Sequence, residues 1–568
     1  MTTYDTDVVV VGAGPVGLTL ANLIGVRGHR VTVLEARHEL IDYPRGVGLD
    51  DESVRTLCTA GLWQQVQPYT VPHHVVRLVN GAGRVLATND PRTQEFGHPR
   101  KHGFIQPLVD RELAAGLGRF PDACLRFGHR VVDLHDHGDH VTVTAERLDA
   151  GGEAAGTVTV TARYAVGCEG GSSFTRKWMG VGFEGRSPST RWVVIDVEND
   201  PVGTPSVYLG ADPRRPYVSI GLPQGVRRWE FMLHDDEPTE RVEDPAFLHA
   251  LLARHVPDPA ALTVINRRTF THHGRVASDF RKGRVFLAGD AAHLMPVWLG
   301  QGWNSGIRDA TNLAWKLTAV LGGDAGDALL DTYTQERRKH ACDMIDVNMA
   351  AGTVMKMGRF AGRLRDASAA ALNLVPKWKS YFTELRFKPM PRYDTGVVAD
   401  QATLTPGRAR PGFKHGRLAP FTDSAGRLSP VGLQFIQPRV NTAAATGVLL
   451  DEVTGPWWTL ATWGTDPTAF LSPADLALVR RHRIRLVSFM PETQRAWAEK
   501  RYAASPAPVT VVGDPDGALK NWFDVRACGL VILRPDRFVA AACLTQQAPR
   551  ALAAVARAAS LTAEGDRA

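Results

Sequence analysis

The chain has 568 residues, of which 44% are hydrophobic and 22% charged, and its formal net charge is +7. At roughly 150 residues per domain this length predicts two to four domains, and the composition excludes a disordered, collagen-like or coiled-coil protein. The sequence has no run of lysine or arginine, which argues against a nucleic-acid partner. The small positive charge excess suits small anionic molecules. The six cysteines lack the spacing of a zinc site or a disulfide framework, so we expect reduced thiols and a cytoplasmic location.

The first apolar stretch, Val8–Val26, has 19 residues and no charge, which is close to the length of a membrane span. It contains four glycines and Pro15, which would break a helix that faces lipid. The residues before it include Asp5 and Asp7 but no lysine or arginine, unlike a signal peptide. We therefore expect neither a membrane span nor a membrane partner.

The same stretch has the order of a dinucleotide-binding unit. A β-branched run, Asp7–Val11, predicts a buried parallel strand, and a glycine loop, an apolar helix and a second strand ending at Glu35 follow it. The loop consists of Gly12, Ala13, Gly14, Pro15, Val16 and Gly17. Its glycines permit a tight turn, the approach of a pyrophosphate and close helix–strand packing, while Glu35 can accept hydrogen bonds from ribose hydroxyls. The pattern predicts a bound dinucleotide and leaves FAD and NAD open.

Two later segments bear on that choice. An apolar strand, Arg284–Ala288, ends in Gly289 and Asp290, and a second glycine loop, Gly300–Gly306, precedes a long helix. Earlier in the chain, Ala165–Gly171 reads Ala-Val-Gly-Cys-Glu-Gly-Gly. Together with the first loop, these motifs resemble those of the single-component (group A) flavoprotein aromatic hydroxylases. The resemblance implies an α/β (α+β overall) fold with a Rossmann-like FAD-binding domain, bound FAD, and NADH or NADPH and O₂ as cosubstrates.

The resemblance also implies roles for individual residues. It assigns cofactor contacts to Gly12, Ala13, Gly14, Pro15, Gly17, Glu35, Arg45, Gln106, Glu169, Gly289, Asp290, Gly300, Gln301, Gly302 and Asn304. Asp290 would bond the ribityl chain or its pyrophosphate side, although a turn or capping aspartate is the structural alternative. Pro296 and Trp303 would shape the pocket beside the flavin ring. For His293 we favour a packed structural histidine over a catalytic acid.

Short sequence segments spread over residues 5–545 narrow the resemblance to the hydroxylases of phenylpropanoid acids. They include Ile41–Arg45, Phe104–Pro107, Arg386–Pro391, Phe435–Pro438 and Arg534–Ala541. Two residues depart from the family pattern. Glu169 replaces the usual aspartate, which bears on contacts to flavin and nicotinamide. Trp303 replaces Met, Leu or Tyr, which bears on the substrate rather than on the cofactor.

Strand-like runs fill residues 75–110 and 185–280, interrupted by turn residues, and predict an antiparallel sheet inserted in the FAD-binding domain. In the family such a sheet roofs the substrate pocket. Tyr217 and Arg215 are the candidate substrate contacts, with the arginine facing a substrate carboxylate. Aromatic strand residues usually belong to the core and adjacent arginines usually face solvent, so this alternative stays open.

From Pro389 to Pro438, seven prolines and few apolar runs predict a linker. Beyond it, strands and helices alternate and end in a hairpin before an alanine-rich helix, the order of a thioredoxin-like domain. Cys528 and Cys543 lack redox spacing, so we expect a structural or oligomerisation role there. We predict an FAD-binding domain over residues 1–75, 105–185 and 280–390, a substrate-binding sheet domain over 76–104 and 186–279, and the linker and thioredoxin-like domain over 391–568.

These features predict a flavin-dependent monooxygenase, because the cofactor supplies the reactive group and no metal site is needed. The resemblance implies hydroxylation of a phenol next to its existing hydroxyl, through a flavin C4a-hydroperoxide. We expect a small phenolic substrate with a carboxylate. Two alternatives stay open: a hydroxylase of another phenol or a polyketide, for which Trp303 is the hint, and an FAD-binding or redox-sensing protein without oxygenase activity. Homo-oligomerisation is left open.

Overall fold

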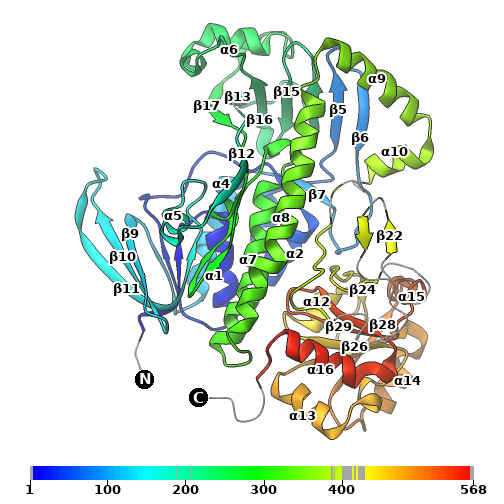
Figure 1. Ribbon diagram of the computed structural model, residues 1–568. Coiled ribbons are helices and arrows are strands. Elements are labelled where there is room, and N and C mark those ends of the chain that lie inside the picture. The colour runs from blue at the N-terminus through cyan, green and yellow to red at the C-terminus, as the bar shows by residue number, and fades with distance from the viewer. Residues whose placement is uncertain are drawn as a thin grey trace. The chain divides into compact units, whose positions relative to one another are not determined.

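The computed structural model describes residues 4–188, 190–204, 206–384, 388, 390–399, 412–414, 417–419 and 429–562. The chain divides into two compact units (Figure 1). Unit 1 comprises residues 1–94, 98–310 and 341–389, and unit 2 comprises 95–97, 311–340 and 390–568. The described residues do not include much of the predicted linker. They also leave out Arg386, Phe387 and Pro389 of the Arg386–Pro391 segment. The borders of the three predicted domains stay a prediction.

The N-terminal strand lies at the centre of a mixed sheet, sheet A, in unit 1. Parallel strands run in the order β20, β11, β1, β2 and β8, and β19, β10 and β9 add antiparallel pairs. Their bounds are β1 Thr6–Val11, β2 Val31–Leu34, β8 Ala123–Arg126, β9 His129–Asp136, β10 Val141–Leu148, β11 Ala154–Gly167, β19 Arg281–Lys282 and β20 Val285–Leu287. β1 is almost wholly buried, as a strand covered on both faces must be, which explains its run of valines. The predicted Rossmann-like part is confirmed.

Helices and two small sheets complete this part of the chain. The helices include α1 Pro15–Gly25, α2 Asp51–Thr59, α3 Trp63–Val66, α4 Gln106–Gly116, α5 Phe174–Met179, α6 Pro245–Leu252, α7 Gly302–Leu321, α8 Ala328–Met355, α9 Arg359–Asn373 and α10 Pro376–Thr383. The small sheets contain β3 Gly48–Asp50, β4 Thr70–Pro72 and β7 Lys101–Phe104, and β12 Phe183–Arg186, β18 Gly274–Ala277 and β21 His293–Leu294. Among the helices that the structure describes, none is both long enough and apolar enough to cross a membrane.

The predicted inserted sheet, sheet C, has seven strands in the order β17, β13, β16, β15, β14, β5 and β6, antiparallel except for β14 with β5. Their bounds are β5 Val76–Asn80, β6 Val85–Asn89, β13 Arg191–Val197, β14 Val207–Ala211, β15 Tyr217–Gly221, β16 Arg227–Met232 and β17 Val264–Thr271. Side chains alternate between two faces. The outer face, which includes Ile195 and Phe231, packs against α6. The inner face, which includes Trp192 and Met232, packs against Trp298 and α8.

Unit 2 contains the predicted C-terminal α/β domain. Its sheet has the order β28, β27, β26, β29 and β30, with the first three parallel and the last two forming an antiparallel hairpin. Strands and helices are α12 Leu450–Thr454, β26 Thr459–Trp463, α13 Pro473–Arg481, β27 Arg485–Pro491, α14 Glu492–Tyr502, β28 Val509–Asp514, α15 Ala518–Asp524, β29 Leu530–Leu533, β30 Val539–Cys543 and α16 Ala548–Ala558. Parallel strands followed by a hairpin are what the thioredoxin-like prediction requires. Within the described part of the chain, neither Cys528 nor Cys543 forms a disulfide.

A buried ion network ties this domain to the parts of α7 and α8 that belong to unit 2. The Glu336 carboxylate accepts hydrogen bonds from both terminal nitrogens of Arg534, each at 2.8 Å, and from Nζ of Lys316 at 2.8 Å. Arg534 also donates to Asp536. Burial alone raises the pKa of Glu336, but Arg534 and Lys316 more than offset this and lower it to about 2. Glu336 is therefore charged at neutral pH and balances two buried cations.

Glu336→Gln should lower the free energy of unfolding by about 3–5 kcal/mol, because Lys316 would remain buried without its carboxylate partner and Arg534 would keep only Asp536. Urea unfolding followed by tryptophan fluorescence measures this. The control is Glu499→Gln on α14, which removes a partly exposed pair with Arg495 and should change stability by no more than about 0.5 kcal/mol. Equal effects of the two substitutions would contradict the role given to the network.

Candidate functional site

The first glycine loop has the geometry that its sequence predicts. Gly12 has φ +102°, and a Cβ placed on it would lie 2.8 Å from the carbonyl oxygen of Cys168. A Cβ on Gly17 would collide with the Gly12 carbonyl, so α1 packs directly on the loop. Gly14 differs, because a Cβ there would meet nothing within 4 Å. Open space thus adjoins the N-terminus of α1, where backbone N–H groups favour a phosphate.

Glu35 closes one side of this space. Its carboxylate accepts hydrogen bonds from the backbone N–H of Ala13 at 2.8 Å and of Arg37 at 2.9 Å. These contacts fix the end of β2 against the glycine loop. Each carboxylate oxygen can accept further bonds, so the position suits a ribose with two hydroxyls.

Arg45 and Asp290 approach one another from distant parts of the chain. Arg45 Nη2 lies 3.8 Å from Asp290 Oδ2, and the two side chains are 53% and 40% exposed. Both groups are therefore accessible to a ligand. Gln106 is not: its Oε1 accepts the N–H groups of Arg45 and Gly46, and its Nε2 donates to Asp110 at 3.0 Å. We assign Gln106 to positioning the Arg45 loop, whereas a direct cofactor contact stays a prediction.

The Gly-Asp segment is held from behind by Asp309 of α7. Asp309 Oδ2 accepts the Gly289 N–H at 2.9 Å and contacts His293 Nε2 at 2.7 Å. His293 is buried, in the arrangement of the structural histidine that we favoured. Arg176 joins the same segment to the earlier motif, since it donates to the carbonyls of Ala291 and Gly171.

Glu169, which replaces the family aspartate, is occupied by the chain itself. Its carboxylate accepts the Thr175 N–H at 2.9 Å and the Ser173 hydroxyl at 2.7 Å. The longer side chain thus caps the start of α5, as N-terminal carboxylates commonly do. A contact with cofactor stays a prediction.

The second glycine loop leads into α7 and leaves two buried polar atoms without partners. Gly300 has φ +62°, and Gly302 begins α7. Among the described residues, neither Gln301 Oε1 nor Trp303 Nε1 has a hydrogen-bond partner. The Trp303 ring contacts Phe104 edge-on, with centroids 5.2 Å apart, and lies beside Gly46. Because buried polar groups are normally paired, these two atoms mark a place for a ligand with polar edges.

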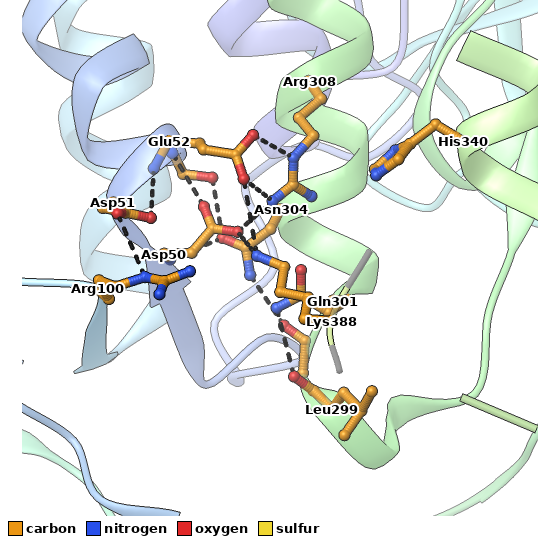
Figure 2. Close-up of polar contacts among 12 residues, drawn as sticks. Asp50, Asp51, Glu52, Arg100, Leu299, Gln301, Asn304, Arg308, His340 and Lys388 are labelled. Atoms are coloured by element: carbon orange, nitrogen blue, oxygen red, sulfur yellow. Dashed lines mark hydrogen bonds and ion pairs between the residues drawn. The ribbon is translucent and has the colours of Figure 1, made fainter. Parts of the chain in front are cut away.

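A charged cluster that the sequence analysis missed fixes this loop in place. Figure 2 shows Arg308 and Asn304 pointing from α7 toward the start of α2. Asn304 accepts the Asp50 N–H at 3.0 Å and donates to the carbonyls of Gly48 and Gly300, both at 2.9 Å. Arg308 Nε donates to Glu52 at 2.8 Å, and its Nη2 pairs with Asp50. In the sequence, this cluster is visible as a run of three acidic residues, Asp50, Asp51 and Glu52.

The charges in the cluster are balanced. Lys388 Nζ donates to Asp50 at 3.0 Å, so Asp50 faces two cations. Burial alone raises the pKa of Asp50, but Arg308 and Lys388 more than offset this and lower it. Burial, with Asp50 and Glu52 nearby, raises the pKa of Asp51 to about 8. Asp51 thus keeps its proton at neutral pH, and Asp50 and Glu52 supply the negative charge that faces Arg308.

Pro296 leads into the turn Val297–Leu299, which packs on the inner face of sheet C. The Trp298 ring stacks on His272 at 4.6 Å and meets Trp192 edge-on at 4.9 Å. Among the described residues, neither Trp192 Nε1 nor His272 Nε2 has a hydrogen-bond partner. An aromatic wall with two unused polar atoms therefore adjoins Pro296.

The two predicted substrate contacts lie elsewhere. Tyr217 packs on the outer face against the α6 cluster, with its ring 4.3 Å from that of His255. Arg215 forms two 2.7 Å bonds with Glu237 and donates to the Met232 carbonyl. Neither side chain reaches the aromatic wall, because strand alternation places Tyr217 on the opposite face from Met232. Their substrate role stays a prediction that this geometry does not favour.

The residues present fit FAD. The space at Gly14 suits a pyrophosphate, Glu35 suits a ribose, and Arg45 with Asp290 flanks the path to the second glycine loop. The unpaired atoms of Gln301 and Trp303 suit the polar edge of a flavin ring.

Gly14→Ala should fold normally, since its backbone is extended and its Cβ meets open space. The methyl group should instead occupy the space of the pyrophosphate and weaken FAD binding about tenfold or more, equivalent to about 1.4 kcal/mol. Flavin fluorescence titration of the apoprotein measures the affinity, and its thermal midpoint checks the fold. The control is Gly118→Ala, whose Cβ also meets nothing within 4 Å. Equal FAD affinity of the two variants would contradict the placement.

Comparisons with known proteins agree with this site. The family described as FAD binding domain matches residues 5–348, and the family described as HcaD C-terminal domain matches residues 432–558. A relative from Mycobacterium avium (strain 104), named 3-(3-hydroxy-phenyl)propionate/3-hydroxycinnamic acid hydroxylase, is 48% identical over 569 residues, covering 99% of this chain and 94% of the relative. A relative of the same name from Mycobacterium sp. (strain JLS) is 49% identical, covering 96% and 90%.

Among solved structures, OxyS anhydrotetracycline hydroxylase from Streptomyces rimosus is 26% identical, with a TM-score of 0.71 and coverage of 97% of this chain and 98% of that one. Sequence and structure therefore agree over nearly the full chain. The chain belongs to the family of FAD-dependent aromatic hydroxylases and is an FAD-dependent aromatic monooxygenase.

Proposed function

We propose that the protein hydroxylates 3-(3-hydroxyphenyl)propionate and 3-hydroxycinnamate next to the existing hydroxyl, using NADH or NADPH and O₂. The observation that carries this proposal is the 48% identity, over 99% of the chain, to a hydroxylase named for these two acids. The aromatic wall beside Pro296 supports a planar ring as substrate.

FAD would be held by the first glycine loop, Glu35, Arg45 and Asp290, with its ring system beside the Gly300–Asn304 backbone. When bound and reduced by the nicotinamide nucleotide, it supplies the activated oxygen atom. The chain's own residues must orient the phenol and keep water away from the reacting centre. Trp303 and Phe104 provide apolar cover on the α7 side, and the inner face of sheet C provides an apolar surface beside Trp298.

The two unused nitrogens of the wall suit the phenol oxygen. His272 Nδ1 accepts the Val297 N–H at 3.5 Å, which leaves the proton of a neutral ring on Nε2. Burial, with Lys356 nearby, lowers the pKa of His272 to about 3, so the ring is neutral at physiological pH. His272 Nε2–H and Trp192 Nε1–H can therefore both donate to a phenol oxygen and favour its anionic character.

Arg268 suits the carboxylate of these acids. It lies on the inner face of sheet C, two residues along β17 from Phe270, a spacing of about 6.5–7 Å in a strand. Its Nη2 donates to the Pro44 carbonyl, while the buried Nη1 has no partner among the described residues. Burial, with Arg228 nearby, lowers the pKa of Arg268 to about 10. An unpaired guanidinium nitrogen on the same face of the sheet as the wall can bind the acid end of a short side chain.

The test of the function is an assay of purified protein with 3-(3-hydroxyphenyl)propionate, 3-ethylphenol and a polycyclic phenol. We expect stoichiometric catechol formation with the acid. Arg268→Met should raise KM for the acid about tenfold to a hundredfold, the loss of a charge-assisted bond of about 1.5–3 kcal/mol, with little change for 3-ethylphenol. The control is Arg267→Met, because Arg267 is on the outer face and pairs with exposed Glu243.

Preferred turnover of the polycyclic phenol would instead favour the polyketide alternative, which the similarity to anhydrotetracycline hydroxylase keeps open. Cofactor oxidation that no phenol stimulates would favour a protein without oxygenase activity.

Trp303→Ala should uncouple the reaction. Removing the indole opens a cavity beside Phe104, so water enters and the ring is held less firmly. We expect more hydrogen peroxide and less catechol per NAD(P)H consumed, together with a stability loss of about 3–5 kcal/mol. Trp303→Phe keeps most of the packing and should stay largely coupled. A folded, FAD-loaded Trp303→Ala protein with an unchanged product ratio would place Trp303 away from the reacting centre.

A further inference from the structure

Helices α9 and α10 carry a concentration of exposed apolar side chains. Of the fifteen large hydrophobic side chains that are exposed in the described part of the chain, six lie within residues 359–383. They are Phe360, Leu364, Leu372, Leu374, Val375 and Trp378. Phe360 is 86% exposed and Leu374 is 83% exposed. Clustered exposure of this kind marks an interaction site, whereas single exposed residues do not.

The other side of α9 already makes the contacts that attach it to unit 1. Arg365 donates to the Ala211 carbonyl at 2.9 Å, Asn373 donates to the Leu86 carbonyl at 2.8 Å, and Asp366 accepts from Asn80 at 2.8 Å. Figure 1 shows both helices at the β5–β6 end of sheet C, away from α6. The apolar side is therefore not needed to hold the helices in place.

The apolar positions follow one helix face. Phe360, Leu364, Ala367 and Ala371 are separated by four, three and four residues, the spacing of a single stripe. Leu374 and Val375 lie at the junction between α9 and α10, and Trp378 lies in the first turn of α10. The exposed face of α9, the junction and the start of α10 together carry the six exposed apolar side chains, and we call this surface the α9–α10 patch.

The α9–α10 patch is also strongly cationic. Arg359, Arg363, Lys377 and Lys379 are exposed, and none has an ion-pair partner in the part of the chain that the structure describes. Asp366 is the one acidic residue of the sequence between 356 and 383, and Arg365 neutralises it at 2.8 Å. Four unmatched positive charges therefore border the apolar band.

We propose that the α9–α10 patch binds the surface of an anionic lipid membrane. Tryptophan, phenylalanine and leucine bordered by lysine and arginine are the composition of helices that lie in a membrane interface. Two weak signals, apolar insertion and attraction to anionic headgroups, together give stable but reversible binding. A second copy of the chain fits less well, because a symmetric contact would oppose four cations to four cations.

This proposal departs from the sequence-based expectation of no membrane partner. That expectation rested on the broken Val8–Val26 stretch and concerned a helix that crosses the bilayer. A patch that lies on the surface needs no such helix. The proposal is also independent of the hydroxylation chemistry, since none of the patch residues belongs to the site described above.

The test is co-sedimentation of the full-length, FAD-loaded protein with vesicles. We expect binding to phosphatidylcholine vesicles that contain phosphatidylglycerol, and much weaker binding to phosphatidylcholine alone. Lys377→Gln with Lys379→Gln should weaken binding about fivefold for each charge removed, and high salt should act in the same direction. Phe360→Ser with Leu374→Ser and Trp378→Ser should abolish insertion. The control is Trp497→Ser on α14, which alters another exposed tryptophan and should bind as the wild type does.

Flavin content and NAD(P)H oxidation of each variant should match the wild type, which shows that the fold is intact. Absence of binding to the anionic vesicles at low salt would overturn the proposal, as would equal binding by the patch variants. Sedimentation equilibrium gives a further decisive result. If the wild type self-associates and the patch variants are monomeric, the occupant is a second copy and the membrane proposal fails.

Discussion

The buried pairing of Arg308 with Asp50 and Glu52 is the interaction on which the geometry of the site depends. It joins α7 to the start of α2, and Asn304, one turn earlier on α7, accepts the Asp50 N–H and donates to the carbonyls of Gly48 and Gly300. Removing one member of such a buried pair costs about 3–5 kcal/mol, because the remaining charge stays desolvated. The structure begins α7 at Gly302, inside the predicted glycine loop, so this pairing and the bonds of Asn304 together fix the position of the loop.

Local features of the site could be predicted from the sequence because their cause is local. Gly17 is required because the backbone of Gly12 lies close to it in the same turn. Gly12 is required because the backbone at Cys168, which follows the neighbouring strand, lies close to it, and the fold class defines where that strand lies. Glu35 ends a strand whose length and burial are visible as an apolar run. The same reasoning gave the alternating strands and helices of the C-terminal domain.

Features that depend on long-range pairing could not be predicted. Tyr217 was a reasonable substrate contact by residue type, but one residue along a strand exchanges the two faces of a sheet. The register of β15 against β16 places Tyr217 beside Phe231 on the α6 side, and its substrate role stays a prediction. Arg268 was not among the predicted substrate contacts, because nothing in its own segment shows that its side chain bonds to Pro44. Contacts more than two hundred residues apart leave no periodic trace in one sequence.

The polar residues of the motifs fall into two groups that differ in whether their hydrogen bonds are already used. Gln106 and Asn304 are both buried and bonded to backbone on several sides, so their work is to hold loops. Arg45 and Asp290 keep their charged groups accessible, and the Trp303 indole nitrogen has no partner among the described residues. A sequence motif contains residues of both groups, and the sequence alone does not tell which residue belongs to which group. Because a buried polar group is costly when unpaired, the unpaired atoms of Gln301 and Trp303 are the ones within these motifs that a bound ligand can satisfy.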